Sequence, residues 1–260
     1  MSSTSSSADY GIDAPYVIRN LLIGAAAALI AFALMATGVW SGRIGPVRFG
    51  AIGFLFMSLG LAASGFGMWW GSRYGKVKER EKLISLIDWR GDEQVLDVGC
   101  GRGLLLIGAA RRLTTGKATG IDIWQTEDLS GNKAEATLEN ARLEGVADRV
   151  EVRTVDMRKM PFEDAMFDIV VSRAAIHNLY SAADRAAAIR EIARVMKTGG
   201  SAVIDDIRHR DEYTAAFEAS GCDVVRYSSA AKSLFWLIVT FGSLSPATLL
   251  VQKPRDHQKS

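Results

Sequence analysis

Three glycines at alternate positions, directly behind a run of strand-forming residues, are the first feature of this sequence that could do chemistry. They are Gly99, Gly101 and Gly103 in the segment QVLDVGCGRG, and the acidic residue Asp97 stands just before them. Where a strand ends in glycines and continues into a helix, backbone N–H groups are left free, and the missing Cβ atoms let a ligand lie against the main chain. The segment predicts a nucleotide-type site, with a purely structural turn as the alternative.

The glycine spacing distinguishes between two ligand classes. Dinucleotide-binding folds use G-x-G-x-x-G, which suits a pyrophosphate, whereas this loop reads G-x-G-x-G. A carboxylate at Asp97 would repel a diphosphate and attract a cationic ligand. A nicotinamide-dependent oxidoreductase is therefore disfavoured.

Two further acidic residues follow predicted strands. Asp122 comes nineteen residues after Gly103, where a carboxylate can accept the protons of both ribose hydroxyls. Asp156 ends the next strand, within reach of an adenine amino group. A surface carboxylate or a helix cap is the alternative role for Asp122.

These residues are embedded in an alternation of strand and helix patterns, as a parallel α/β sheet requires. The predicted strands cover residues 94–98, 118–123, 150–155, 167–172, 201–207, 223–227 and 248–252. The predicted helices cover residues 78–87, 104–113, 133–143, 183–196 and 212–219. The three acidic residues then share the carboxyl edge of the sheet, where ligands of open α/β folds collect.

Two uncharged segments precede this domain. Residues 21–40 and 49–70 hold twenty and twenty-two residues without a charge, and at about 1.5 Å per residue each can cross a hydrocarbon core of about 30 Å. Tryptophans at the segment ends, Trp40, Trp69 and Trp70, suit the membrane interface. We therefore expect a transmembrane hairpin over residues 17–72, with a cleaved secretory signal or a buried soluble hairpin as alternatives.

The flanks of the spans predict their orientation and packing. RYGKVKEREK after the second span carries five basic and two acidic residues, so the positive-inside rule assigns both termini and the following domain to the cytoplasm. Residues 1–16 are Ser-rich and predict a disordered tail. Small residues four apart in the second span predict close helix contact, at Gly60 and Ser64 and at Gly67 and Gly71.

The net charge is +2, from 31 basic and 29 acidic residues, and gives no signature of a nucleic-acid partner. Two cysteines, Cys100 and Cys222, form neither a disulfide framework nor a metal-ligand pattern, so we expect no metal and reduced thiols. Nothing here predicts the oligomeric state.

Four segments resemble the class I S-adenosylmethionine-dependent methyltransferases, particularly the branch of quinone-biosynthesis and other small-molecule enzymes. They are VLDVGCGRG, GIDIW, VRTVDMRKMPF and FDIVVSRAAIHNL, in this order. The resemblance covers about residues 78–253. With the change to a soluble composition near residue 76, we expect an enzyme domain over residues 76–253 and a polar tail at 254–260. The resemblance also implies a Rossmann-like, seven-stranded α/β sheet whose last strand is antiparallel.

The resemblance implies S-adenosylmethionine as cofactor and a role for each matching residue. The glycine loop, with Asp97, Gly99, Cys100, Gly101 and Gly103, would surround the methionine part of the cofactor. Asp122 would bind the ribose, and Asp156 with Met157 would lie at the adenine. Ile123 or Trp124 would pack against the purine, although Trp124 serves equally well as core filling.

Methyl transfer from a sulfonium needs positioning and exclusion of water more than it needs a side-chain nucleophile. A base helps when the acceptor carries a proton, and His177 is the candidate because an imidazole has a pKa of about 6.5. A hydrogen bond within its own loop is the alternative role. Asp205 and Asp206 end the fifth strand, and alternation lets only one of them face the site.

An apolar run at residues 232–247 predicts a core strand, a cap on the site or a membrane contact. Together with the hairpin it favours a membrane-anchored methyltransferase acting on a small hydrophobic or lipid-like molecule. A polar acceptor, with the spans serving only for localisation, is one alternative. A non-catalytic S-adenosylmethionine-binding membrane protein is the other.

Overall fold

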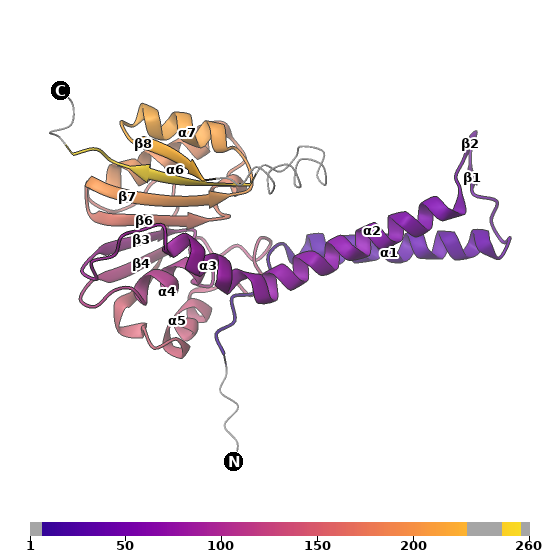
Figure 1. The fold of residues 1–260 in the computed structure, drawn as a ribbon, viewed down its shortest axis with the longest axis horizontal. Coiled ribbons are helices and arrows are strands. Elements are labelled where there is room, and N and C mark those ends of the chain that lie inside the picture. Colours follow the sequence, from indigo (N-terminus) through magenta and orange to yellow (C-terminus); the bar gives the residue numbers. More distant parts are fainter. Residues whose placement is uncertain (1–6, 228–245, 256–260) are drawn as a thin grey trace, which may run out of the picture. The chain divides into compact units, whose positions relative to one another are not determined.

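A computed structural model describes residues 7–227 and 246–255. The described residues form two compact units, drawn as a ribbon in Figure 1. The sheet unit comprises those within Met1–Tyr10, Val77–Trp124 and Asn132–Ser260, and the hairpin unit comprises Gly11–Lys76 and Gln125–Gly131. The predicted apolar run at 232–247 lies almost wholly outside the described residues.

The sheet unit is built on one seven-stranded sheet, in the order β5-β4-β3-β6-β7-β9-β8 (Figure 1). The first five strands in this order are parallel, and β9 runs antiparallel to both of its neighbours. This confirms the predicted Rossmann-like sheet with an antiparallel last strand. The strands are β3 (Gln94–Val98), β4 (Lys117–Asp122), β5 (Val150–Thr154), β6 (Phe167–Arg173), β7 (Met196–Asp206), β8 (Asp223–Tyr227) and β9 (Ala247–Gln252).

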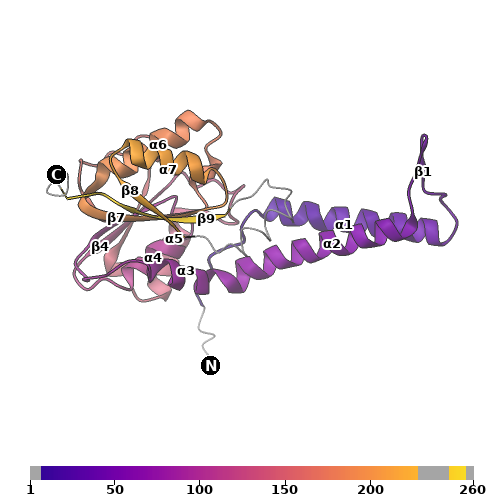
Figure 2. The ribbon, with the colours of Figure 1, turned by 45° about the horizontal axis from the view of Figure 1, so that its top comes forward.

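Helices cover both faces of this sheet, as Figures 1 and 2 show. They are α3 (Lys76–Ile84), α4 (Leu104–Ala110), α5 (Ala134–Leu143), α6 (Ala182–Val195) and α7 (Arg210–Ala219). The alternation of β3 assigns the faces, because Val95 packs with residues of α3, α4 and α5 while Leu96 and Val98 pack with α6 and α7. Burial on both faces explains why β3 reads as a nearly continuous apolar run.

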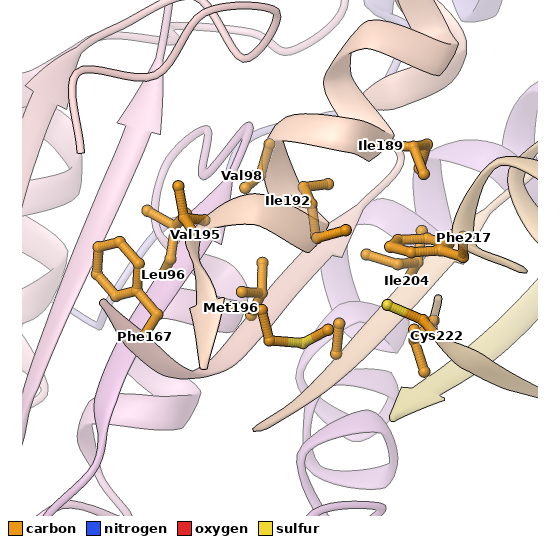
Figure 3. Close-up of a cluster of buried hydrophobic side chains, with 14 of the residues drawn as sticks. Leu96, Val98, Phe167, Ile189, Ile192, Val195, Met196, Ile204, Phe217 and Cys222 are labelled. Atoms are coloured by element: carbon orange, nitrogen blue, oxygen red, sulfur yellow. The ribbon is translucent and has the colours of Figure 1, made fainter. Parts of the chain in front are cut away.

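The core beneath α6 and α7 is shown in Figure 3. Ile189 and Ile192 of α6, Phe217 of α7 and Leu96 of β3 belong to this core, and all four are fully buried. Full burial of such a side chain contributes about 1.5–3 kcal/mol each. Ile204, near the end of β7, belongs to the same core.

The hairpin unit contains two long apolar helices, α1 (Pro15–Ala36) and α2 (Ala51–Trp70). A short antiparallel ladder of β1 (Arg43–Ile44) and β2 (Val47–Arg48) joins them, and a π-helical turn (Gly71–Gly75) follows α2. By length and composition both helices could cross a membrane, with the second apolar helix continuing to Ile84. Proline at the start of α1 suits a position whose N–H lacks a helical partner.

The two helices pack against each other, but not through the predicted pairs of small residues. The Ser58 hydroxyl of α2 donates to the Ala25 carbonyl of α1 at 2.8 Å, and a Cβ on Gly65 would lie 3.2 Å from Leu22. A Cβ on Gly60 would instead meet open space, and Ser64 bonds back within its own helix. That prediction is wrong because spacing alone does not say which face of a helix meets its neighbour.

The predicted disordered tail over residues 1–16 is also wrong for its described part. In the sheet unit the Tyr10 side chain is buried beside Arg80 and donates from its hydroxyl to Glu144. In the hairpin unit the segment before α1 pairs with residues 128–130, through an antiparallel bridge of Asp13 and Leu129. The composition of residues 1–16 could not reveal this order, because it depends on partners that are distant in the sequence.

Candidate active site

The backbone amides of the glycine loop already have partners inside the sheet unit. Gly99 and Cys100 both donate to the Ile121 carbonyl, at 2.8 and 3.0 Å. Gly101 donates to Oδ2 of Asp122 at 2.8 Å, and Gly103 donates to the Cys100 carbonyl at 2.8 Å. The expectation of free N–H groups is therefore wrong for these four residues, because the loop folds back onto the end of β4.

The glycines instead allow close packing of the loop. Gly99 and Gly103 have left-handed φ angles of +72° and +86°, which disfavour residues with a Cβ. A Cβ on Gly99 would overlap the Cβ of Ala175, and one on Gly103 would lie 2.8 Å from Thr137. Glycine at these positions brings the loop against the segment after β6 and against α5.

Asp97 lies beneath the loop and not on its open side. Its carboxylate is buried and accepts the N–H of Leu106, in the first turn of α4, at 2.8 Å. Burial raises the pKa of Asp97 to about 8, against the Leu106 hydrogen bond, which lowers it. Burial also raises the pKa of the Cys100 thiol, so neither group is an exposed anion in this structure.

Asp122 is the partly exposed carboxylate of the loop region. One oxygen accepts the Gly101 N–H, and the other accepts the Trp124 N–H at 2.6 Å and the Asn132 side-chain amide at 3.3 Å. The carboxylate thus fixes the glycine loop to the end of β4. Sequence reasoning missed Asn132, whose only signal is its place just before α5.

The sequence left open whether Ile123 or Trp124 would pack against a purine, and whether Trp124 would instead fill the core. The Trp124 indole donates to the Thr154 hydroxyl at 2.8 Å and packs against the core beneath α3 to α5. The Ile123 side chain remains 49% exposed directly after Asp122. Ile123 is thus the apolar side chain open to a ligand at this strand end.

Asp156 is engaged by a residue that the sequence did not single out. Arg158 bonds both carboxylate oxygens, with Nε at 3.0 Å from each and Nη2 at 2.6 Å. This pairing is the main cause that lowers the pKa of Asp156. Met157 packs against the core, with its Cε 3.7 Å from where a Cβ on Gly99 would lie. The sequence feature that could have indicated this pair is the position of Arg158 two residues after Asp156.

His177 lies in a short 3-10 helix (Ile176–Asn178) after β6 and is bound to Asp206 at the end of β7. The ring Nδ1 lies 2.6 Å from Oδ1, and the His177 backbone N–H donates to Oδ2 at 3.1 Å. The Asp205 carboxylate instead accepts the Thr248 hydroxyl at 2.7 Å. Alternation along β7 therefore directs Asp206, and not Asp205, toward His177.

Residues 96–204 match the family model described as a methyltransferase domain, and this match spans the glycine loop, Asp122, Asp156 and His177. Residues 96–204 are therefore similar to a methyltransferase domain. Similar curated proteins include methyltransferase GfsG of Streptomyces halstedii, 28% identical over 178 residues, which are 58% of this chain and 60% of GfsG. Demethylmenaquinone methyltransferase of Lactiplantibacillus plantarum is 30% identical over 134 residues, covering 51% of this chain and 53% of that protein.

The methyltransferase domain also has relatives among solved structures. Geranyl diphosphate C-methyltransferase of Streptomyces coelicolor, in complex with Mg2+, geranyl diphosphate and S-adenosyl-L-homocysteine, superposes with a TM-score of 0.53. The two share 18% sequence identity, and the match covers 68% of this chain and 77% of that one, which supports the fold alone. The chain spans only part of the curated relatives that it matches, 60% and 53% of the two named above.

Proposed function

We propose that this chain is a membrane-anchored methyltransferase that transfers a methyl group from S-adenosylmethionine to a small hydrophobic or lipid-like acceptor. The observation that carries the proposal is Asp122, a partly exposed carboxylate at the end of β4, bonded to the glycine loop of a methyltransferase domain. Asp122 lies where a carboxylate binds ribose hydroxyls in nucleotide-binding α/β folds.

The residues around Asp122 fit this cofactor in chemical type. The carboxylate supplies acceptors for the ribose hydroxyls, and the exposed Ile123 supplies an apolar surface for the purine. Gly99, Cys100, Gly101 and Gly103 would lie beside the methionine part of the cofactor, above the buried Asp97. Met157 and Asp156 would flank the adenine, and Asp156 would exchange part of its pairing with Arg158 for the ligand. S-adenosylmethionine supplies an electrophilic methyl group on a sulfonium that leaves as a neutral thioether.

The remaining work of the protein is to orient the acceptor, exclude water and move a proton. His177 is the group suited to the proton, because its ring is held by Asp206 near the carboxyl edge of the sheet. Proton transfer by a positioned side chain contributes about 10²- to 10⁴-fold to the rate.

The hairpin supports an acceptor that partitions into a bilayer. In the most apolar 18-residue stretch of each long helix, only 17% and 11% of the residues are buried within the protein, whereas a core helix of a soluble protein is mostly buried. A hydrocarbon environment would cover this exposed apolar surface. One of the similar curated proteins is named a demethylmenaquinone methyltransferase, which supports an acceptor of this kind.

Calorimetry on the full chain in detergent tests the cofactor. We expect S-adenosylmethionine to bind and NAD not to bind, and the reverse result would overturn the proposal. Asp122→Asn should weaken the affinity by roughly tenfold to a hundredfold, because a hydrogen bond to a charged group contributes about 1.5–3 kcal/mol. Asp148→Asn, at a carboxylate with a 73% exposed side chain, is the matched control and should bind as the wild type does.

Transfer of a radiolabelled methyl group into a membrane lipid extract tests the acceptor class. Labelled lipid-soluble product is the expected result. Label found only in the polar fraction would contradict a lipid-like acceptor, and binding without any labelled product would favour a non-catalytic protein.

A further inference from the structure

We infer that Asn140 is a positioning residue for cofactor binding, because it fastens the glycine loop to Asp9 and Tyr10, in the segment ahead of the hairpin. This segment lies outside residues 96–204, which match the methyltransferase model. The inference rests on the proposed function, since it concerns how that site is held ready for S-adenosylmethionine. All of the contacts that carry it lie within the sheet unit.

Two buried side chains of α5 hold successive carbonyls of the glycine loop. The Thr137 hydroxyl donates to the Gly101 carbonyl at 2.6 Å, and the Asn140 side-chain amide donates to the Arg102 carbonyl at 2.9 Å. Thr137 and Asn140 stand three residues apart on one face of the helix and are 0% and 2% exposed. Because Asp122 accepts the N–H of Gly101, the peptide groups on both sides of Gly101 are fixed in orientation.

The side-chain amide of Asn140 also pairs with the backbone of Asp9. Its Nδ2 donates to the Asp9 carbonyl at 2.8 Å, and its Oδ1 accepts the Asp9 N–H at 2.9 Å. An amide NH2 has two hydrogens to donate, so at Asn140 one goes to the loop and the other to the segment. If either partner moves away, a buried polar group is left unpaired, which costs free energy. Nη2 of Arg102 makes a second link, to the Asp9 carboxylate at 3.1 Å.

Tyr10 anchors the same segment at the C-terminal end of α5. It is 7% exposed, and its hydroxyl accepts a hydrogen bond from Arg80 at 2.8 Å and donates one to Glu144. Glu144 follows Asn140 by four residues, so the two side chains share one face of the helix. The segment therefore has one anchor at the end of α5 and another at the glycine loop, and its docking is coupled to the conformation of that loop.

A loop that is held in its binding conformation binds a ligand more tightly than a loop that samples several conformations. The apparent affinity falls in proportion to the fraction of molecules whose loop is ready to bind. Asn140 and the segment raise this fraction, because they fix the loop carbonyls before the cofactor arrives. By reciprocity, bound S-adenosylmethionine should stabilise the docked segment by the same free energy.

Calorimetry with S-adenosylmethionine on the full chain in lipid nanodiscs tests this role. Asn140→Asp places a carboxylate against two carbonyl oxygens, so the affinity should weaken roughly tenfold to a hundredfold. Asp9→Ala combined with Tyr10→Phe loosens the segment without changing a loop residue, and should weaken the affinity about threefold to tenfold. Glu139→Gln, next to Asn140 but with a 51% exposed side chain, is the matched control and should bind as the wild type does.

Hydrogen exchange separates a positioning role from a purely structural one. In the wild type, S-adenosylmethionine should slow exchange of the Asp9 N–H as well as that of the Gly101 N–H, because the cofactor stabilises both partners of Asn140. In Asn140→Asp, saturating cofactor should still protect the loop but no longer the segment. Protection of the loop without protection of Asp9 in the wild type would overturn the inference.

Methyl transfer into combined lipid and polar extracts gives a second readout. Both variants should raise KM for S-adenosylmethionine while kcat stays within about twofold of the wild-type value. A lower kcat with unchanged KM would overturn the positioning role. Tighter cofactor binding in the segment variant would also overturn it, because the segment would then block the site. If Asn140→Asp fails to fold in urea unfolding, the segment variant decides.

The outcomes distinguish this inference from the proposed function. Wild-type affinity in both variants would overturn the role of Asn140 and leave the methyltransferase intact. A wild-type chain that binds no S-adenosylmethionine would instead contradict the proposed function.

Discussion

Asp97 and Asp122 show how two carboxylates of one loop region differ by environment. Asp97 accepts a helix N–H in the interior, whereas Asp122 ties the loop to β4 and stays half-buried. A buried carboxylate costs free energy when ionised, because the interior solvates the charge less well than water does. The sequence predicted a cationic ligand at Asp97 and ribose hydroxyls at Asp122, but of the two carboxylates only Asp122 is partly exposed.

Asp97 makes the stability of the sheet unit depend on pH. Its pKa is raised from 3.8 to about 8 in the folded protein, so between these values the folded state binds a proton that the unfolded state has lost. Stability should therefore fall as pH rises through this window, by at most about 1.4 kcal/mol per pH unit. Urea unfolding at pH 5 and pH 7.5 measures this slope. Asp97→Asn, which keeps an acceptor for Leu106, should flatten it, and identical slopes in the two proteins would refute the assignment.

At the scale of elements, the site depends on how closely the β3–α4 loop approaches the segment after β6. Gly99 has no side chain, and any Cβ at this position would overlap the Cβ of Ala175. This approach brings the loop after Asp97 against Ala175, two residues before His177, so it would connect the proposed cofactor residues to the proposed base. Two glycines with the same backbone angle allow the effect of that contact to be separated from backbone strain.

Gly99→Ala and Gly145→Ala form this matched pair, because both glycines have a φ of +72° but a Cβ on Gly145 would meet open space. Gly145→Ala should lose about 1–2 kcal/mol of unfolding free energy from the left-handed backbone alone. Gly99→Ala should lose roughly 1–3 kcal/mol more from overpacking, together with affinity for S-adenosylmethionine. Equal losses in denaturant unfolding would show that the contact with Ala175 does not matter.

At the scale of the whole molecule, the chain joins a sheet unit with a core on both faces to a hairpin unit whose long helices expose most of their apolar side chains. The segment before α1 is held within the hairpin unit by the ion pair of Lys76 and Asp13 at 2.7 Å. Lys76 and Arg80, two of the five basic residues after the second span, are thus buried and paired in the folded protein. The positive-inside bias acts during insertion, before such pairs form, so all five residues count toward the predicted orientation.

Thiol labelling in oriented vesicles tests that orientation. The native cysteines Cys100 and Cys222 are buried, so new cysteines at exposed positions give the signal. Pro46→Cys, in the turn between the helices, should react only from the outer side, and Asp148→Cys, in the sheet unit, only from the cytoplasmic side. The full chain should also stay in the membrane after alkaline carbonate extraction. Labelling of both positions from one side, or release by carbonate, would contradict two membrane spans.

The sequence by itself determined the elements and the carboxyl edge on which the candidate site residues lie. The predicted strands at 94–98 and 223–227 match β3 and β8 residue for residue, because alternation and glycine punctuation are local signals read along one segment. The same local patterns placed Asp122 and Asp156 at the ends of predicted strands and His177 just after one.

Only the tertiary structure decided what these side chains contact. The amides of Gly99 and Cys100 bond to the last residues of β4, and Arg158 bonds to Asp156. His177 bonds to Asp206 and not to Asp205. Tyr10 is buried and accepts a hydrogen bond from Arg80. Each of these pairings joins side chains or backbone groups whose directions depend on how the loops fold and which strands become neighbours. Local sequence patterns determine the backbone conformation of one segment. Hydrogen bonds and burial also depend on which other segments become its neighbours in the folded chain.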